Sequence, residues 1–254
     1  MLDESLLDQM RTEFNAMKHP VRLILFTKDV GCETCPDALK VAKSIKARAP
    51  KIALEIYDQV MDRDKVEQYG AKQVPAIIVQ TRNGEMVRFY GLFRDVFFRT
   101  LVKTILAAAE EVAPPENIRR TLSHLQHQVD IQVFVETDCK QCVPVAETAI
   151  ALSLRSDLIV SDILIASDYP DLIRKHSIKT LPKTIFGTNL HMDGHVSESE
   201  FLEMVFQAEG IQAGPDRRCL TCGQPSPDII CGSCKTKIQA EASDRKRKWE
   251  KIME

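Results

Sequence analysis

The pattern of apolar and polar positions along the chain predicts one order of elements that occurs twice. Apolar residues at three- and four-residue steps indicate helices, and short continuous apolar runs indicate strands buried on both faces of a sheet. The first copy of this order is predicted to contain a helix at 3–17, a strand at 21–26, an amphipathic helix that Pro50 ends, a strand at 52–57, a short helix at 62–69, a hairpin of strands 76–80 and 86–90, and a closing helix at 96–111.

The same order occurs a second time further along the chain. The second copy is predicted to contain a helix at about 116–128, a strand at 131–135, a helix at 143 to about 154, a strand at 158–165, a short helix near 169–175, a hairpin of strands 183–186 and 190–193, and a closing helix at 198–208. Strands that alternate with helices in this way predict the α/β class, with two units that each contain a mixed sheet flanked by helices.

Two stretches rich in proline and glycine divide the chain into three parts. Pro114 and Pro115 cannot sit in a continuing helix, and a second interruption follows at 210–215. We therefore expect a first unit at 1–113, a second unit at 116–212, and a small module with a helical tail at 215–254.

The eight cysteines form four Cys-x-x-Cys pairs, and the first two pairs occupy equivalent places in the repeat. Cys32 and Cys35 follow a buried strand and precede a helix, as do Cys139 and Cys142, which lie 107 residues further on. This setting places the first cysteine at a helix N-terminus, where free N–H groups and the helix dipole favour a thiolate. A thiolate attacks disulfides, and a second cysteine one turn on can resolve the mixed disulfide.

A proline follows the first cysteine of each pair by the same 43 residues. Pro75 comes after Val74, Pro182 comes after Leu181, and each proline opens an apolar strand. Such an X-Pro bond is a candidate for the cis form, and it would present backbone beside the sulfur atoms for a substrate segment to pair with. The alternative for each cysteine pair is a zinc knuckle or two inert buried thiols, and the matched prolines favour the exchange site.

These features together resemble the thioredoxin fold, in which a Cys-x-x-Cys turn joins a strand to a helix and a strand-opening proline follows. Two such units in one chain resemble the protein disulfide oxidoreductase family. Residues 1–210 match the layout of that family, including the segments Val74-Pro75-Ala76-Ile77, Arg88-Phe89-Tyr90-Gly91 and Ile131-Gln132-Val133-Phe134-Val135. A related arrangement occurs in the N-terminal domain of the flavoprotein that reduces alkyl hydroperoxide reductase.

The resemblance implies dithiol–disulfide exchange, with a flavoprotein disulfide reductase as electron donor and oxidised proteins or peroxiredoxins as clients. It implies that Cys32 and Cys139 are the nucleophiles, and that Cys35 and Cys142 are their resolving partners.

The residues between the cysteines depart from the familiar patterns. They are Glu33-Thr34 and Lys140-Gln141, where thioredoxins have Gly-Pro and glutaredoxins have Pro-Tyr. The direction of electron flow therefore stays open. Lys140 should favour the thiolate of the neighbouring Cys139, and Glu33 should oppose that of Cys32.

The last two cysteine pairs form a separate motif near the C-terminus. Cys219, Cys222, Cys231 and Cys234 have the spacing of two knuckles that hold one zinc ion with four thiolates. A segment this short cannot bury a core of its own, so bound metal would supply its fold. The alternative, a further set of exchange cysteines, lacks the setting between a strand and a helix. We therefore expect a zinc-ribbon-like module.

A basic tail at 243–252 can extend this module as a helix. Either the helix is solvated and packs Trp249 and Ile252 on the module, or module and tail form an adaptor for a partner protein.

Composition narrows the remaining function classes. A net charge of −2 over 254 residues gives no field suited to nucleic acid or an anionic membrane, and one short basic run is weak evidence for nucleic-acid binding. No apolar run is long enough to span a bilayer and the N-terminus has no signal-peptide pattern, so we expect a cytoplasmic protein. The sequence has no fingerprint for an organic cofactor.

Two alternatives to an exchange enzyme are a non-catalytic scaffold that recruits partners through the zinc ribbon and a carrier that holds a persulfide on Cys139.

Overall fold

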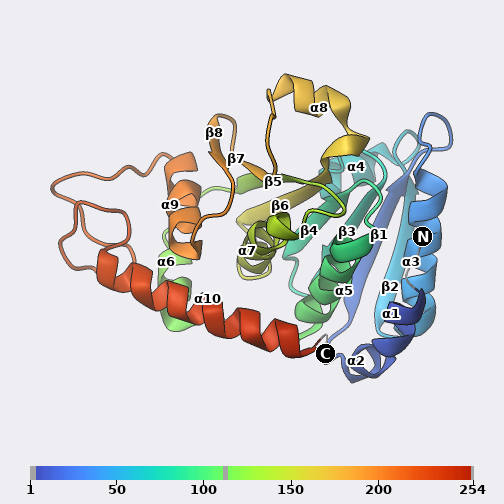
Figure 1. Cartoon of the computed structure of the whole chain (residues 1–254), viewed down its shortest axis with the longest axis horizontal. Helices are drawn as coiled ribbons and strands as arrows, with labels where there is room; N and C mark the ends of the chain where they lie inside the picture. Colours follow the sequence, from blue (N-terminus) through green and yellow to red (C-terminus); the bar gives the residue numbers. More distant parts are fainter. Residues whose placement is uncertain (1–3, 111–113, 253–254) are drawn as a thin grey trace.

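Eight strands form one continuous mixed sheet that runs through both units (Figure 1). The computed structural model describes residues 4–110 and 114–252. The predicted helix ends at 3 and 111 and the expected boundaries at 1, 113 and 254 therefore lie outside the described residues. The side chains of Trp249 and Ile252 also lie outside them.

The elements follow the predicted order. The first unit contains α1 (Glu4–Gln9), α2 (Arg11–Ala16), β1 (Val21–Thr27), α3 (Cys35–Arg48), β2 (Ile52–Asp58), α4 (Arg63–Tyr69), β3 (Ala76–Gln80), β4 (Met86–Tyr90) and α5 (Asp95–Glu110). The second unit contains α6 (Glu116–Leu122), β5 (Val129–Val135), the 3₁₀ helix η1 (Lys140–Cys142), α7 (Val143–Ser153), β6 (Ile159–Ile165), the 3₁₀ helix η2 (Ala166–Asp168), α8 (Pro170–Lys175), β7 (Lys183–Phe186), β8 (Leu190–Asp193) and α9 (Glu198–Ala208).

Two helices differ from their predictions. The helix expected at 3–17 is divided into α1 and α2 at Met10, whose buried side chain sits at the turn between them. The helix expected at 116–128 ends at Leu122, because turns bring Leu125 back into the core before β5 begins.

The strand order shows the repeat directly. It is β2-β1-β3-β4 in the first unit and β6-β5-β7-β8 in the second. In each unit the first two strands in sequence are parallel, and the hairpin is antiparallel. A parallel pairing of β4 with β6 joins the two halves, and it places Arg88 opposite Asp162. These two side chains form a buried ion pair across the junction.

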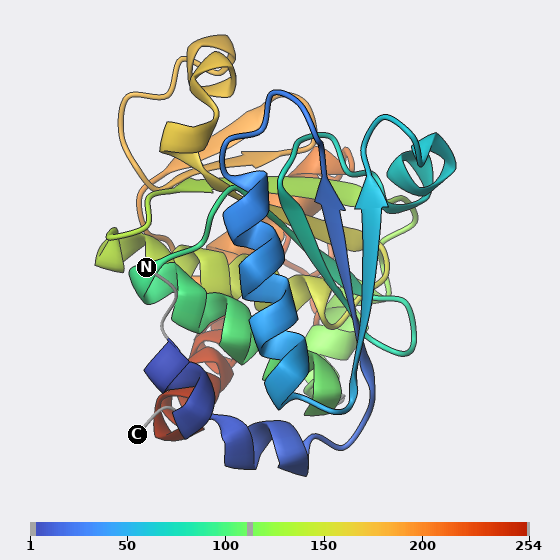
Figure 2. The same ribbon diagram turned by 90° about the vertical axis from the view of Figure 1, so that its right-hand side faces the viewer.

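Alternate residues of the central strands enter two separate hydrophobic clusters, because side chains alternate across a pleated sheet. Leu23 and Leu25 of β1 join the cluster that α3, α5, α7 and α9 cover. Ile24 and Phe26 join a smaller cluster on the other face, which α4 and α8 cover. Figure 1 shows α8 and α5 on opposite sides of the sheet, and Figure 2 shows α3 lying against β1 and β2.

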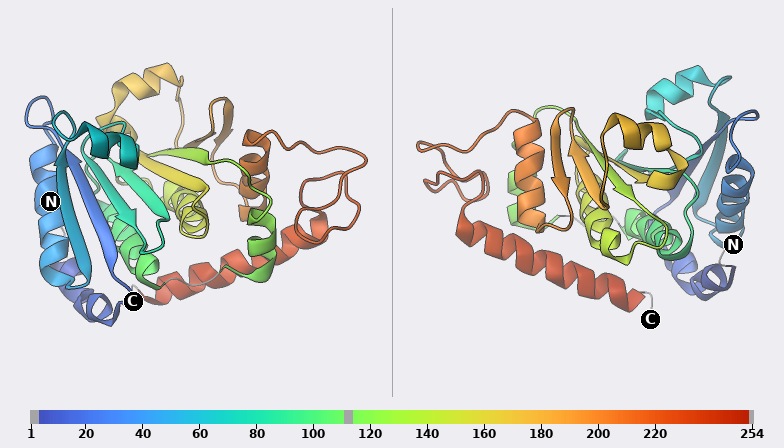
Figure 3. Two further views of the ribbon diagram at one scale, coloured as in Figure 1. Left: turned by 180° about the vertical axis from the view of Figure 1, so that it is seen from behind. Right: turned by 45° about the horizontal axis from the view of Figure 1, so that its top comes forward.

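The C-terminal module and its helix lie along the second unit. The helix α10 (Gly232–Ile252) begins directly at the cysteine knuckles and runs from them toward the N-terminal helices (Figure 3). Arg245 of α10 and Arg155 both pair with Glu198 at the start of α9, and Lys235 pairs with Glu203. The helix therefore starts earlier than the predicted tail, and its far end leads away from the knuckles. No helix among residues 4–110 and 114–252 has the length and apolar composition needed to cross a membrane.

Candidate active site

The first Cys-x-x-Cys pair lies at the carboxyl end of β1. Cys32 and Cys35 form a disulfide, with Cys32 partly exposed and Cys35 only 4% exposed. The sequence placed Cys32 at the N-terminus of the helix, but α3 begins at Cys35. Its first backbone bond runs from Ala38 N to Thr34 O, so Cys32 lies in the turn just before the helix.

The second pair has the same arrangement. Cys139 and Cys142 form a disulfide, with Cys139 partly exposed and Cys142 fully buried. Here the turn between them is the 3₁₀ helix η1, and α7 follows directly. In both units the first sulfur is therefore the one that a substrate can reach, and the second is held behind it.

Both strand-opening prolines have the predicted conformation. The Val74–Pro75 and Leu181–Pro182 peptide bonds are cis. The prolines are held alike, because Gly91 N donates to Pro75 O at 3.0 Å and Gly194 N donates to Pro182 O at 2.9 Å.

We call Val74–Pro75 and Leu181–Pro182 the proline segments of the two sites. One contact links a proline segment directly to a cysteine turn. Gln141, between Cys139 and Cys142, donates from Nε2 to Leu181 O at 3.3 Å. The residue before the proline therefore adjoins the second disulfide. The substrate-binding role of Val74, Pro75, Leu181 and Pro182 stays a prediction.

The two disulfides present different surfaces. Among the described residues, the large exposed apolar side chains are Val30 (79%), Ile56, Val60 and Met61 (82%), on β2 and on the two loops beside Cys32. A bond of 2.8 Å from Gln59 N to Thr27 O joins these loops. In the second unit, Thr137, Ser167 and Asp168 occupy the places equivalent to Val30, Val60 and Met61. At these three positions the first unit therefore carries exposed apolar side chains where the second unit carries polar ones.

Asp58, at the end of β2, organises the loop that carries Val60 and Met61. Its Oδ1 accepts the N–H groups of Val60 at 2.8 Å and Met61 at 3.0 Å. These donors lower the pKa of Asp58 below its usual value, so the carboxylate stays ionised and holds the loop at neutral pH.

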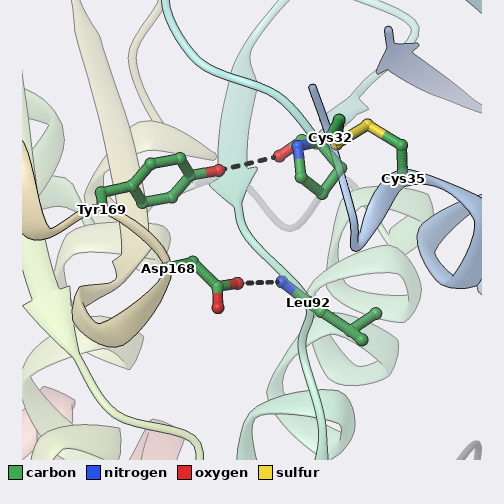
Figure 4. The surroundings of a disulfide bond; sticks show 6 residues. Cys32, Cys35, Leu92, Asp168 and Tyr169 are labelled. Atoms are coloured by element: carbon green, nitrogen blue, oxygen red, sulfur yellow. Dashed lines mark hydrogen bonds between the residues drawn. A yellow bond between two sulfur atoms is a disulfide. The ribbon is translucent and has the colours of Figure 1, made fainter. Parts of the chain in front are cut away.

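Two residues of the second unit that carry no signal in the sequence reach the first site. Asp168 Oδ2 accepts the N–H of Leu92 at 2.8 Å, and the Tyr169 hydroxyl donates to Pro75 O at 3.3 Å. Figure 4 shows the Tyr169 ring pointing toward the Cys32–Cys35 disulfide. Partners 76 and 94 residues apart leave no local signal in the sequence.

The four remaining cysteines converge at one point. The Sγ atoms of Cys219, Cys222, Cys231 and Cys234 all lie within 4.8 Å of one another. Cys231 N donates to Cys219 Sγ at 3.3 Å. Burial of the Cys219 thiol opposes its ionisation, but N–H groups from Cys231, Cys222 and Thr221 outweigh burial and lower its pKa to about 6. The cluster is suited to bind a metal ion.

This cluster is attached to the second unit, away from both disulfides. Thr221 and Thr121 of α6 share a hydroxyl–hydroxyl bond of 2.8 Å, and His124 Nε2 lies 2.9 Å from Leu220 O. Figure 1 shows the module beyond α9, at the opposite end of the molecule from α3.

Comparison with known proteins gives structural matches only. No protein-family model and no curated protein matches the sequence. The N-terminal domain of alkylhydroperoxide reductase AhpF from Enterococcus faecalis matches with a TM-score of 0.73 and 19% identity, over 81% of this chain and 100% of that one. A protein disulfide oxidoreductase from Aeropyrum pernix matches with a TM-score of 0.73 and 25% identity, over 83% of this chain and 96% of that one.

These neighbours and the strand order agree with the resemblance seen in the sequence. The chain has two tandem thioredoxin-fold units and is similar in structure to the AhpF N-terminal domain and to an archaeal protein disulfide oxidoreductase, and its two Cys-x-x-Cys disulfides support a thiol–disulfide oxidoreductase function.

Proposed function

We propose that this protein is an enzyme that exchanges electrons with protein disulfides through Cys32–Cys35 and Cys139–Cys142. The observation that carries the proposal is the matched pair of disulfides. Each closes a turn between a strand and a helix, and each combines a partly exposed first cysteine with a buried second one. Inert structural thiols have no need of this arrangement in both units.

The exposures support a division of roles within each pair. In the direction of substrate reduction, the thiolate of Cys32 or Cys139 attacks a substrate disulfide, forms a mixed disulfide and expels one substrate thiolate. The thiol of Cys35 or Cys142 then loses its proton and attacks the neighbouring sulfur. This step releases the second substrate thiolate and leaves the enzyme disulfide, so two electrons pass to the substrate. The backbone of Val74 and Leu181, beside Pro75 and Pro182, is the proposed surface for the substrate segment.

A second protein must reduce the enzyme disulfides again. The similarity to the AhpF N-terminal domain favours a flavoprotein disulfide reductase as donor, with a peroxiredoxin or other oxidised protein as acceptor.

The four-cysteine cluster is proposed to hold one zinc ion. Four thiolates at about 2.3 Å from a tetrahedral zinc ion lie about 3.8 Å apart, and Cys222 Sγ lies 3.8 Å from Cys231 Sγ. A zinc ion bound by four thiolates has no open coordination position for a substrate or water, so its proposed role is to stabilise the fold of the module. Cys219 and Cys234 would supply the buried side of the site, with Cys222 and Cys231 closing the outer side.

Trapping of the mixed disulfide tests the proposed roles. Cys35→Ser and Cys142→Ser each remove a buried resolving thiol, so the reduced variants should accumulate disulfide-linked complexes with an oxidised protein such as insulin. Non-reducing electrophoresis with mass spectrometry identifies the linked cysteine.

The matched controls are Cys32→Ser and Cys139→Ser, which remove the attacking thiol from the same turns. A complex that forms through Cys35 or Cys142 in these controls would contradict the assignment. If none of the variants forms a complex and wild type reduces no protein disulfide, the scaffold function is favoured. Cyanide-labile sulfur on Cys139 would favour the persulfide carrier instead.

A further inference from the structure

The segment Ser167–Tyr169 lies where the second unit meets the first. It follows β6, the strand that pairs with β4 of the first unit. The equivalent strand of the first unit is β2, which forms a free edge of the sheet. The two units are therefore not related symmetrically. The loop after β6 faces the first unit, whereas the loop after β2 lies at the outer edge of the sheet, away from the second unit.

One end of this segment is fixed beside the second disulfide. Ser167 donates from N and from Oγ to the carboxylate of Glu136, at 3.2 and 2.9 Å. Glu136 also accepts Thr137 N through its side chain and Cys139 N through its backbone oxygen. The segment is thus held firmly before it reaches across to the first unit.

The other end of this segment forms hydrogen bonds with the first site, one of them with its proline segment. Asp168 accepts the N–H of Leu92, and Tyr169 donates its hydroxyl to the same Pro75 oxygen that Gly91 N already contacts (Figure 4). The approach is close, since a Cβ atom on Gly91 would lie 2.6 Å from Asp168 Oδ2. Tyr169 is 8% exposed and packs in the cluster that also contacts Val74.

We propose that Tyr169 of the second unit is a positioning residue for the first Cys-x-x-Cys site. Through its hydrogen bond to Pro75 O it fixes the proline segment beside Cys32, so the first site is complete only when the second unit is docked. This inference rests on the proposed function, because it assigns Tyr169 to the site where a substrate segment would bind.

The hydroxyl has the chemistry that this role requires. Burial, and then the nearby Asp168 and Tyr90, raise the pKa of Tyr169 well above its usual value. It therefore stays protonated and donates at any physiological pH.

Among residues 4–110 and 114–252, no hydrogen bond from the first unit to the second site matches this contact. Pro182 O accepts Gly194 N, and among the described hydrogen bonds no side chain donates to it. The side-chain bond at that site runs instead from its own Gln141 to Leu181 O. The effect of Tyr169 should therefore be confined to the first disulfide.

Two parent variants separate the sites. Cys139→Ser with Cys142→Ser leaves only the first site, and Cys32→Ser with Cys35→Ser leaves only the second. A neutral hydrogen bond contributes about 0.5–1.5 kcal/mol. Tyr169→Phe should therefore lower kcat/KM for insulin reduction by about 2- to 12-fold in the first parent, mainly through KM, with less than a twofold change in the second.

A readout that needs no turnover accompanies the kinetics. Loss of the hydroxyl should speed hydrogen exchange of the Gly91 amide, which shares Pro75 O, and leave the Gly194 amide unchanged. Tyr90→Phe is the matched control, because it removes a buried hydroxyl of the same cluster that donates to Gly70 O rather than to Pro75 O. It should not slow the first site selectively.

The outcomes separate this inference from the proposed function. Two inactive parents would overturn the proposed function, while Gly91 exchange still tests the positioning contact. Unchanged Gly91 exchange in Tyr169→Phe, or an equal loss of activity in two active parents, would overturn the inference.

Discussion

At the scale of single residues, the two sites differ most clearly in the charge of the residue that follows the first cysteine of each pair. Glu33 follows Cys32 and Lys140 follows Cys139, and both charged residues are exposed. In water, two unit charges 4 Å apart interact by about 1 kcal/mol. Lys140 favours one thiolate and Glu33 opposes the other, so the two effects add. In the reduced protein, Cys139 should therefore react with iodoacetamide up to about 30-fold faster than Cys32 at neutral pH, and screening by salt lowers this ratio.

Charge exchange provides the control for this prediction. Glu33→Lys and Lys140→Glu should together reverse the order of labelling, and high salt should reduce the difference in both proteins because exposed charges are screened. Faster labelling of Cys32 in wild type would show that another feature of its environment outweighs the neighbouring charge.

The residues that carry the proposed chemistry could be identified from the sequence because their spacing is local and repeated. A cysteine pair three residues apart and a proline 43 residues further on define the same site in each unit. Tyr169 and Asp168 could not be identified in this way. Their contacts with Pro75 and Leu92 exist only because β6 pairs with β4, and nothing in the neighbouring sequence specifies that pairing.

The junction between β4 and β6 is the feature at the scale of elements on which the arrangement of both sites depends. Arg88 and Asp162 are 4% and 1% exposed, so removal of Arg88 would leave the buried Asp162 carboxylate without its ion-pair partner. Breaking such a pair costs about 3–5 kcal/mol. We expect Arg88→Met to lower the free energy of unfolding by that amount in urea denaturation.

An exposed arginine pair is the matched control. Arg119 bonds Glu116 on the surface of α6, where such pairs contribute about 0–1 kcal/mol, so Arg119→Met should have little effect. Combining Arg88→Met with Asp162→Leu should recover part of the loss by removing both charges. If Arg88→Met cost no more than Arg119→Met, the pair would not be an important part of the junction.

Hydrophobic periodicity predicted the individual helices and strands well, since each has a buried stripe or run of its own. The buried residues of α3 are Ala38, Val41, Ala42 and Ile45, at the three- and four-residue steps of the pattern, together with Cys35. Helix ends were predicted less well. Met10 and Leu125 have apolar side chains that fit a continued helix, but tertiary packing recruits them at turns instead.

The C-terminal module provides a test at the scale of the whole molecule. Its knuckles contact α6 and α9 of the second unit, and α10 is held by Arg245 and Lys235. Purified protein should contain one zinc ion per chain. Removing it with a chelator should make 215–252 sensitive to proteases, because the knuckles have no core of their own.

Thiol exchange should survive this treatment with less than a twofold loss, since both disulfides lie in the thioredoxin-fold units. Cys219→Ser should reproduce the protease sensitivity, and Ser233→Ala, an exposed neighbour that is not a ligand, should not. Protein that carries no stoichiometric metal, or that resists proteases equally without it, would contradict the zinc site.

The repeat predicted two units, but it did not predict that they form one sheet. All seven residues of β6 are buried, whereas β2 at the free edge is largely half-buried or exposed. The two strands have similar apolar content in the sequence, so composition does not reveal which one is covered by the other unit. The expected division at 113 and 116 stays a prediction about folding units.

Reduction of insulin disulfides, driven by dithiothreitol, tests the central claim most directly. Wild type, Cys32→Ser, Cys139→Ser and the double variant are compared at equal concentration, with zinc content and free thiols measured in each. We predict turnover by wild type, a larger loss in Cys139→Ser than in Cys32→Ser, and none above background in the double variant. Wild-type protein with reduced thiols that accelerates insulin reduction no more than the double variant does would contradict the account.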